Sequence, residues 1–277
     1  EYALGRLAGP IFDAAGLSAA RMKIVIIHDD QPNAFVADTS HVFIHSGLLL
    51  RLDTAAEVQA VIAHEVAHIT GGHIIRRQVN MQNASTAAAL GVLLSGAVVA
   101  ATGNGEAAAG LVIGISGSAQ RVLFGHTRAE EASADQAGIR YMARAGIPPQ
   151  AMLDVLEMFR GQEVLSESRQ DPYARTHPLT RDRLRALRGY AAASKLTANP
   201  DPEANYWYAR ARGKLEAFIR PPAYTLRRVP ASDGSDIALM RRAVALHRVP
   251  KPKEAMATMA RLVALRPNDP YYAELQG

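Results

Sequence analysis

The sequence of 277 residues contains no cysteine. Without thiol groups the chain forms no disulfide bond, and it has no thiolate to bind a metal ion. Any zinc site would therefore use histidine and carboxylate ligands, which are typical of catalytic rather than structural zinc centres. The absence of cysteine does not by itself identify the cellular compartment.

Long apolar runs are absent as well. The most apolar region, residues 86–119, contains two apolar segments, 87–101 and 107–119, and each is shorter than the about 20 residues that span a bilayer as a helix. The pattern predicts a hairpin of two apolar helices that packs against the rest of the chain or against a second copy. Peripheral contact with a membrane surface and a lid beside a binding site are the alternatives.

The sequence also lacks a cluster of basic residues. Its formal net charge is +5 and its pI is about 9.6, but lysine and arginine are spread along the chain and are not interleaved with aromatic residues. This distribution argues against nucleic acid as a partner. The chain starts at Glu1 without a signal peptide, which does not decide its location because such peptides are removed on export.

The most informative segment is His64-Glu65-Val66-Ala67-His68, an HExxH motif. Residues four apart share one face of a helix, so both imidazoles can reach one Zn²⁺ ion at about 2.0–2.1 Å. Glu65 points off that face but stays close enough to act on a water bound to the metal. Chance would produce this motif roughly 0.01 times in a chain of this length and composition, so it predicts a zinc hydrolase site.

The residues around the motif indicate a buried helix. Thr54-Ala-Ala-Glu57 resembles a capping box at its start, and the residues that follow are apolar on nearly every face. The alternative interpretation is a buried helix that carries two hydrogen-bonded core histidines. That alternative would place the carboxylate of Glu65 in the core without a cation, which is costly.

A second helix is predicted from residue 127 onward, and it carries Glu131 and Asp135 on one face, a single turn apart. A mononuclear zinc site needs a third protein ligand, which Glu131 could supply, while Asp135 could hydrogen-bond a ligating histidine. Considered alone, the same pattern would fit a solvated acidic face.

Three short segments upstream of the HExxH motif predict a small sheet. Residues 23–28 are β-branched and predict a buried strand, and residues 33–38 and 41–45 predict two more strands joined by a turn. We expect the edge formed by Asn33, Ala34 and Phe35 to accept an extended peptide as an added strand. His41 and His45 share a strand face, where packing or surface roles are favoured over metal binding.

The rest of the chain predicts further helices. A helix is expected over 147–159, a polar flexible loop over 161–176, and then a basic helix whose Arg181, Arg185 and Arg188 form a solvated face. Residues 221–234 predict a linker, and residues 236–269 fit the spacing of a helix–turn–helix repeat of about 34 residues.

The fold class predicted from these elements is α+β. A mainly helical, zincin-type metallopeptidase domain with a small β-sheet is expected over residues 1–199. A helical linker and a partial tetratricopeptide-like (TPR-like) repeat are expected over residues 200–277, because prolines at 200 and 202 mark a boundary.

Four motifs in order resemble the zinc peptidase family of HtpX and the CAAX prenyl protease: Asn33-Ala34-Phe35, HExxH, Arg128-x-x-Glu131-x-x-Ala134-Asp135 and Thr176-His177-Pro178. The likeness is greatest to soluble, repeat-bearing members of the periplasm. It implies a gluzincin site with one zinc ion per chain bound by His64, His68 and Glu131, and with Glu65 as the general base. It also implies a periplasmic location and polypeptide substrates, among them outer-membrane proteins and their assembly machinery.

The function favoured by these observations is a zinc-dependent endopeptidase of envelope protein quality control. A chaperone or scaffold module with a latent metal site is the rival hypothesis, and a metal-dependent hydrolase of non-peptide substrates is a third. His177 has two candidate roles: an oxyanion hydrogen-bond donor, or a fourth zinc ligand on a loop that must move before substrate enters. We favour the fourth ligand, with a surface histidine that caps a helix as the remaining alternative.

Overall fold

The structure, a computed structural model, describes residues 2–79, 82, 128–166, 169–196 and 201–277. The predicted apolar hairpin of residues 86–119 lies outside the described residues. None of the helices in the described ranges combines the length and the hydropathy that a membrane span requires.

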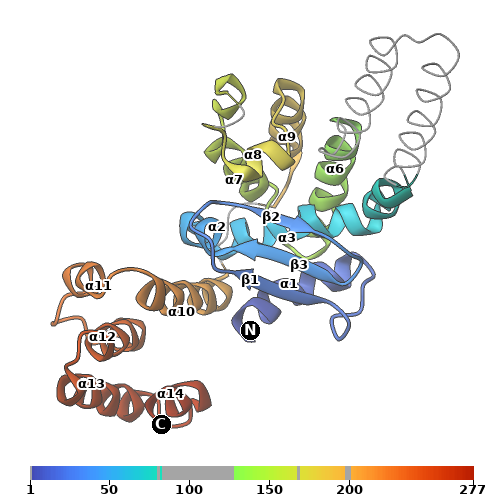
Figure 1. The fold of residues 1–277 in the computed structure, drawn as a ribbon. Helices are drawn as coiled ribbons and strands as arrows, with labels where there is room; N and C mark the ends of the chain where they lie inside the picture. Colours follow the sequence, from blue (N-terminus) through green and yellow to red (C-terminus); the bar gives the residue numbers. More distant parts are fainter. Residues whose placement is uncertain (1, 80–81, 83–127, 167–168, 197–200) are drawn as a thin grey trace, which may run out of the picture.

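A three-stranded sheet consists of β1 (Lys23–Ile27), β2 (Ala34–Val36) and β3 (His41–His45). β3 is central, because it pairs parallel to β1 and antiparallel to β2 (Figure 1). The predicted pairing of 33–38 with 41–45 is present, with Phe35 opposite Phe43. The prediction of a buried strand over 23–28 was wrong in its burial: β1 is an outer strand with a neighbour on one side only, and Ile26 is 41% exposed.

The helix that carries the HExxH motif, α3 (Ala55–Thr70), lies at the centre of the fold and contacts β2 and β3. Its start is capped as the sequence predicts: Thr54 Oγ1 accepts a hydrogen bond from the Glu57 N–H at 3.2 Å. The Glu57 carboxylate reaches back to the Asp53 N–H, one residue before the position expected for a capping box. The start of the motif helix is thus set by local sequence, and its apolar sides fill the core.

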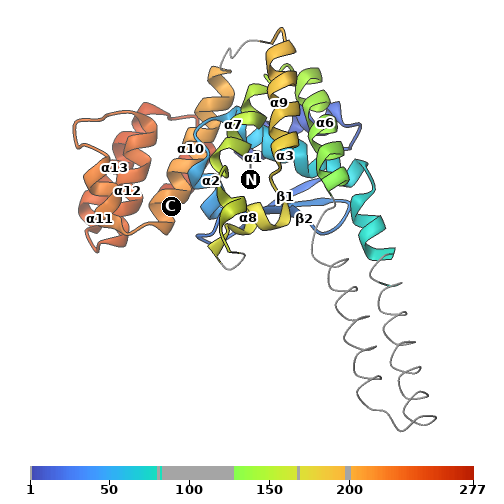
Figure 2. The same cartoon turned by 90° about the horizontal axis from the view of Figure 1, so that it is seen from above.

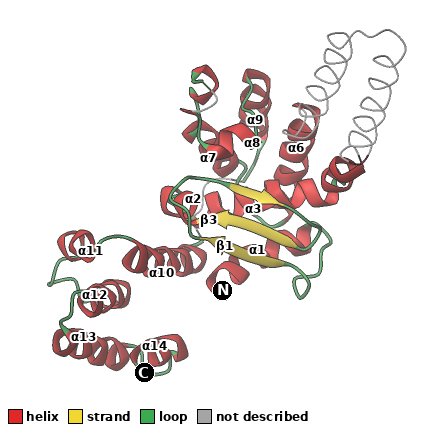
Figure 3. Ribbon diagram, in the orientation of Figure 1, coloured by secondary structure: helices red, strands yellow, loops and turns green. Residues whose placement is uncertain are grey.

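Further elements that the structure describes before residue 194 are α1 (Tyr2–Ala14), α2 (Ser46–Arg51), α6 (Arg128–Arg144), α7 (Gln150–Met158), the 3₁₀ turn η1 (Gln162–Val164), α8 (Pro172–Thr176) and α9 (Arg181–Ala193). Figure 3 shows α6 to α9 on the β2 side of the sheet. The loop predicted over 161–176 was wrong in part, because it contains η1 and α8. Pro172 starts α8, since its fixed φ suits the first helical position.

The C-terminal part contains α10 (Pro202–Ile219), α11 (Pro222–Arg228), α12 (Asp236–Arg248), α13 (Pro252–Leu265) and α14 (Pro270–Gln276). Figure 2 shows α10 between the other C-terminal helices and the rest of the molecule. The buried Tyr208 hydroxyl on α10 reaches the carbonyl oxygens of Leu49 and Leu52. The predicted linker of residues 221–234 contains α11. The pair α12 and α13 occupies the predicted repeat, whose assignment as TPR-like rests on sequence spacing alone.

The motif helix and α6 approach each other closely at Gly138. A Cβ atom added there would lie 2.8 Å from Met152 Cε and 3.3 Å from the backbone carbonyl of Ala63. We therefore expect Gly138→Val to push α6 away from α3 and to lower the free energy of unfolding by about 1–3 kcal/mol in urea denaturation. Gly189→Ala on α9, where nothing lies within 4 Å, is the control and should not lower it. An equal decrease in the free energy of unfolding of the two variants would contradict the close approach of α6 and α3.

Candidate metal centre

Four side chains from separate parts of the chain converge beside the β2 edge. His64 and His68 come from α3, Glu131 comes from α6, and His177 follows α8 directly. His64 Nε2 lies 3.1 Å from His68 Nε2 and 3.2 Å from His177 Nδ1. Carboxylate oxygens of Glu131 lie 3.4 Å from each of His64 Nε2 and His68 Nε2, and 3.2 Å from His177 Nδ1. None of the four residues is more than 3% exposed.

These separations fit a zinc ion. In a tetrahedral site with bonds of about 2.0–2.1 Å, neighbouring ligand atoms lie about 3.3 Å apart. The atoms named above are 3.1–3.4 Å apart. Three imidazoles and one carboxylate also form a nitrogen and oxygen donor set that zinc accepts without cysteine. All four ligand atoms lie within 4.8 Å of one another, so the cluster is a candidate site for one metal ion.

Asp135 lies behind His64. Its Oδ1 is 3.1 Å from His64 Nδ1, the ring nitrogen that faces away from the cluster. On its other side, Asp135 accepts two hydrogen bonds from the Arg183 guanidinium, at 2.7 Å and 2.8 Å. A carboxylate in this place fixes the orientation of a ligating imidazole, and the guanidinium compensates the buried charge of the carboxylate.

Arg183 is a site residue that sequence reasoning missed. It is 5% exposed, and its Nη1 lies 2.8 Å from Glu131 Oε2 and donates a hydrogen bond to Pro178 O at 3.0 Å. The three arginines predicted to form a solvated face, at 181, 185 and 188, are exposed. Arg183 differs from them because it lies four residues before the buried Leu187, on the apolar side of α9. Its position on the apolar side of the helix was the sequence signal that could have identified Arg183 as buried.

Burial and neighbouring charges shift the pKa values of the cluster residues in opposite directions. Burial alone raises the pKa of Glu131 and of Asp135, but His177 beside Glu131 and Arg183 beside Asp135 hold both pKa values below their usual range. Burial lowers the pKa of His64, yet its contacts with Asp135 and Glu131 raise that pKa to about 10. The two carboxylates are therefore ionised and available to a cation.

Glu65 is in a different environment. It is fully buried, and within the described ranges neither carboxylate oxygen has a hydrogen-bond partner. Burial raises its pKa, and its Oε1 lies 3.3 Å from His177 Nε2. A carboxylate that is desolvated and not hydrogen-bonded has a high affinity for a proton, which suits a general base.

The residues predicted to form a substrate edge lie next to the cluster. His177 Nε2 is 3.2 Å from Ala34 O, and the Tyr173 N–H donates a hydrogen bond to Pro32 O at 3.2 Å. Thr176 Oγ1 lies 3.4 Å from Asn33 Oδ1. The ring of Phe35 stacks on Phe43. The segment from Tyr173 to His177 therefore lies along the edge that the sequence predicts to accept a peptide.

His41 and His45 lie outside the cluster, as their favoured interpretation predicts. His41 Nδ1 is 2.8 Å from Asp38 Oδ2, and His45 Nδ1 is 3.2 Å from Gln31 O. Both histidines have local partners in the strand region.

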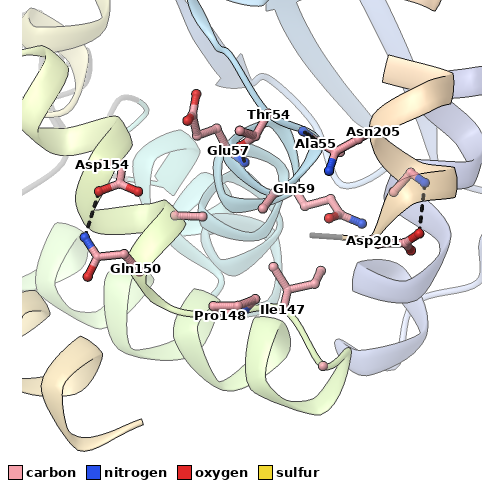
Figure 4. A pocket seen from close by; sticks show the side chains of 14 residues that line it. Thr54, Ala55, Glu57, Gln59, Ile147, Pro148, Gln150, Asp154, Asp201 and Asn205 are labelled. Atoms are coloured by element: carbon pink, nitrogen blue, oxygen red, sulfur yellow. Dashed lines mark hydrogen bonds between the residues drawn. The ribbon is translucent and has the colours of Figure 1, made fainter. Parts of the chain in front are cut away.

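A separate cavity of about 280 Å³ lies at the other end of α3 (Figure 4). Its lining includes Thr54, Glu57, Ile147 and Asn205, which come from the start of α3, the segment before α7, and α10. Thr54 is ten residues before His64 in the sequence, which corresponds to roughly 15 Å along a helix. This cavity is therefore not part of the metal centre.

The sequence is similar to those of known proteins. The sequence model of Peptidase family M48 matches residues 3–191, which include the whole cluster. The beta-barrel assembly-enhancing protease of Yersinia pestis is 28% identical over 258 residues, which cover 90% of this chain and 52% of that protein. The protein of the same name from Escherichia coli (strain K12) is 29% identical over 187 residues, which cover 68% of this chain and 38% of that protein.

A eukaryotic protein is similar as well. The mitochondrial metalloendopeptidase OMA1 of Schizosaccharomyces pombe is 25% identical over 185 residues, which cover 66% of this chain and 51% of that protein. The chain thus spans about half, or less, of the length of these curated relatives.

The compensation of buried charge by Arg183 can be tested by substitution. We expect Arg183→Met to lower the free energy of unfolding of the metal-free protein by about 3–5 kcal/mol, because Asp135 and Glu131 lose a buried cation. Urea denaturation of Arg183→Met and of Arg181→Met, the exposed control, measures the difference. If both variants unfolded at the same urea concentration as the wild type, the role of Arg183 would be disproved.

Proposed function

The chain belongs to peptidase family M48, and we propose that it is a zinc-dependent endopeptidase. The observation that carries the proposal is the buried set of His64, His68, Glu131 and His177, whose ligand atoms lie within 4.8 Å of one another, next to the buried carboxylate of Glu65. The match to the family supports a metal-dependent peptidase. Zinc as the metal is supported by the nitrogen and oxygen donors and by their spacing.

In this proposal His64, His68 and Glu131 hold one zinc ion per chain, and Asp135 orients His64. Bound there, zinc supplies a Lewis acid for the scissile carbonyl group and for the attacking water. Glu65 takes the proton of that water and later returns it to the leaving amine. Its burial supports this role, because a desolvated carboxylate binds a proton readily.

A substrate in extended conformation would pair with the β2 edge at Asn33, Ala34 and Phe35. β2 has a neighbour on one side only, so its outer backbone groups can pair with another strand. In the described structure part of this edge is taken by the segment that ends at His177. Substrate and this segment would compete for the same carbonyl group of Ala34.

We infer that His177 acts as a plug. Its Nδ1 is within 3.2 Å of both His64 Nε2 and Glu131 Oε1, where a fourth ligand would be, and its Nε2 is near Ala34 O. Tyr173 packs on its ring with centroids 4.7 Å apart. A fourth protein ligand closes a zinc site to water, so α8 would have to move before catalysis. The close packing of His177 supports this role over that of a surface histidine.

The substrate class follows from the relatives and from the resemblance in sequence. Two relatives are named for the enhancement of β-barrel assembly, which supports polypeptide substrates in the bacterial envelope, including outer-membrane proteins and their assembly machinery. A periplasmic location is proposed on the same ground. The rival, a chaperone or scaffold with a latent metal site, predicts that biological function survives without peptide hydrolysis.

Substitution of the general base separates these two functions. We expect Glu65→Gln to keep zinc and fold but to lower casein hydrolysis by at least about 10²–10⁴-fold, because the amide cannot take the proton. Glu57→Gln, on the first turn of the same helix, is the control and should hydrolyse casein at the wild-type rate. An active Glu65→Gln enzyme would refute the mechanism, and full biological function of an inactive variant would favour the scaffold.

The plug is tested at His177 itself. With a plug, His177→Ala should hydrolyse casein at the wild-type rate or faster, and zinc should stay bound by the other three residues. If His177 instead stabilises the oxyanion, the turnover rate of the same variant should fall roughly 10²–10³-fold. His28→Ala, at an exposed histidine, is the control. A hundredfold loss with zinc still bound would reject the plug.

A further inference from the structure

We propose that His73 positions His68 for metal binding: His73 Nδ1 accepts a hydrogen bond from His68 Nδ1 and so fixes the tautomer in which His68 Nε2 is free to bind zinc. The inference rests on the proposed function, because it concerns the same centre. His73 lies five residues after the motif that identifies the zinc ligands, and it has no assigned role in the mechanism above.

The two rings are arranged for such a bond. His73 Nδ1 and His68 Nδ1 are 2.9 Å apart, and the ring planes meet at 74° with centroids 4.9 Å apart. Both residues are buried, His68 completely and His73 with 2% of its surface exposed. The opposite nitrogen of His68, Nε2, points at His64 and Glu131. His68 therefore has one nitrogen in the metal cluster and the other on His73.

The direction of the bond follows from the chemistry of imidazole. A nitrogen that binds zinc must be unprotonated, and a neutral imidazole carries its one proton on the other nitrogen. The proton of His68 is therefore on Nδ1, which donates to His73 Nδ1. His73 must then carry its own proton on Nε2. Partners of this kind behind a ligating histidine set its tautomer and raise its basicity.

Two glycines bring His73 to this place. α3 ends at Thr70, Gly72 adopts a left-handed φ of +67°, and the chain is helical again from His73. A Cβ atom on Gly71 would lie 2.7 Å from His73 Nε2 and 2.9 Å from Ala67 O. A side chain at residue 71 would thus displace the His73 ring, while residue 72 needs a conformation that glycine adopts without strain.

The balance of charge explains why the partner of His68 is an imidazole. The partner of His64 is a carboxylate, Asp135, whose charge is compensated by Arg183. The formal negative charges of Glu65, Glu131 and Asp135 equal the positive charges of Arg183 and one Zn²⁺ ion. A carboxylate behind His68 would add one more buried negative charge to this cluster, and burying a charge is costly. A neutral imidazole accepts the same hydrogen bond without adding charge.

The affinity for Zn²⁺ tests this role without reference to activity. Zinc would be titrated against a chromogenic chelator in the full chain, in the wild type and in the variants His73→Phe and His73→Asn, with the exposed His247→Phe as control. Phe keeps a ring but has no acceptor, so we expect it to weaken zinc binding about 10–100-fold. The Asn side chain offers Oδ1 near the position of Nδ1 and should bind zinc nearly as tightly as the wild type.

Unchanged affinity in His73→Phe, or equal weakening by Phe and Asn, would overturn the inference while leaving the proposed function intact. A wild type that takes up no zinc would overturn both. If the variants do not fold, nitrogen NMR of the zinc-loaded wild type decides. The His73 imidazole should carry its proton on Nε2, and a proton on Nδ1 would contradict the role.

Discussion

Buried negative charge is the constraint on which this structure depends. Glu65, Glu131 and Asp135 are each no more than 4% exposed, and they lie within one small volume between α3, α6 and α9. Isolated charges in a protein interior are expensive, so such a cluster persists only with hydrogen bonds and cations in contact.

Arg183 compensates part of this buried negative charge, since it donates hydrogen bonds to Asp135 and forms an ion pair with Glu131. These contacts also join α9 to α6. The rest of the buried negative charge can be compensated by a divalent ion between the imidazoles and Glu131, where the spacing suits such an ion. Helix packing at Gly138, capping at Thr54 and the position of α8 all serve to hold these groups together. The catalytic proposal is a consequence of this arrangement, because a metal ion that balances the charge is also the Lewis acid that hydrolysis uses.

The parts of the fold that could be predicted from the sequence are those set by local periodicity. The spacing of His64 and His68 places them on one face once the helix exists. The two strand segments and the turn within residues 33–45 determine a hairpin. The placement of Glu131 and Asp135 beside the histidines could be predicted because a zinc site with two histidines needs a third ligand. In contrast, the exposure of β1 depends on strand order, and α8 has only five residues, too few for a periodic signal.

Arg183 and His73 show why the rest of the site could not be predicted. Arg183 is one of several arginines in its segment, and its burial depends on how α9 packs on α6. His73 reaches His68 because the chain makes a turn at Gly71 and Gly72, and a motif search that ends at His68 does not include it. Arg183 makes its contacts between helices that are distant in sequence, and His73 makes its contact across a turn. Helix and strand patterns report neither.

The central claim is that the buried cluster is a zinc centre. X-ray absorption at the zinc edge, combined with metal analysis of the purified chain, measures this directly. We expect one zinc ion per chain with about four nitrogen and oxygen ligands at about 2.0–2.1 Å and the scattering signature of imidazole. Zinc far below one ion per chain after loading, or a shell of six oxygen ligands without imidazole, would contradict it.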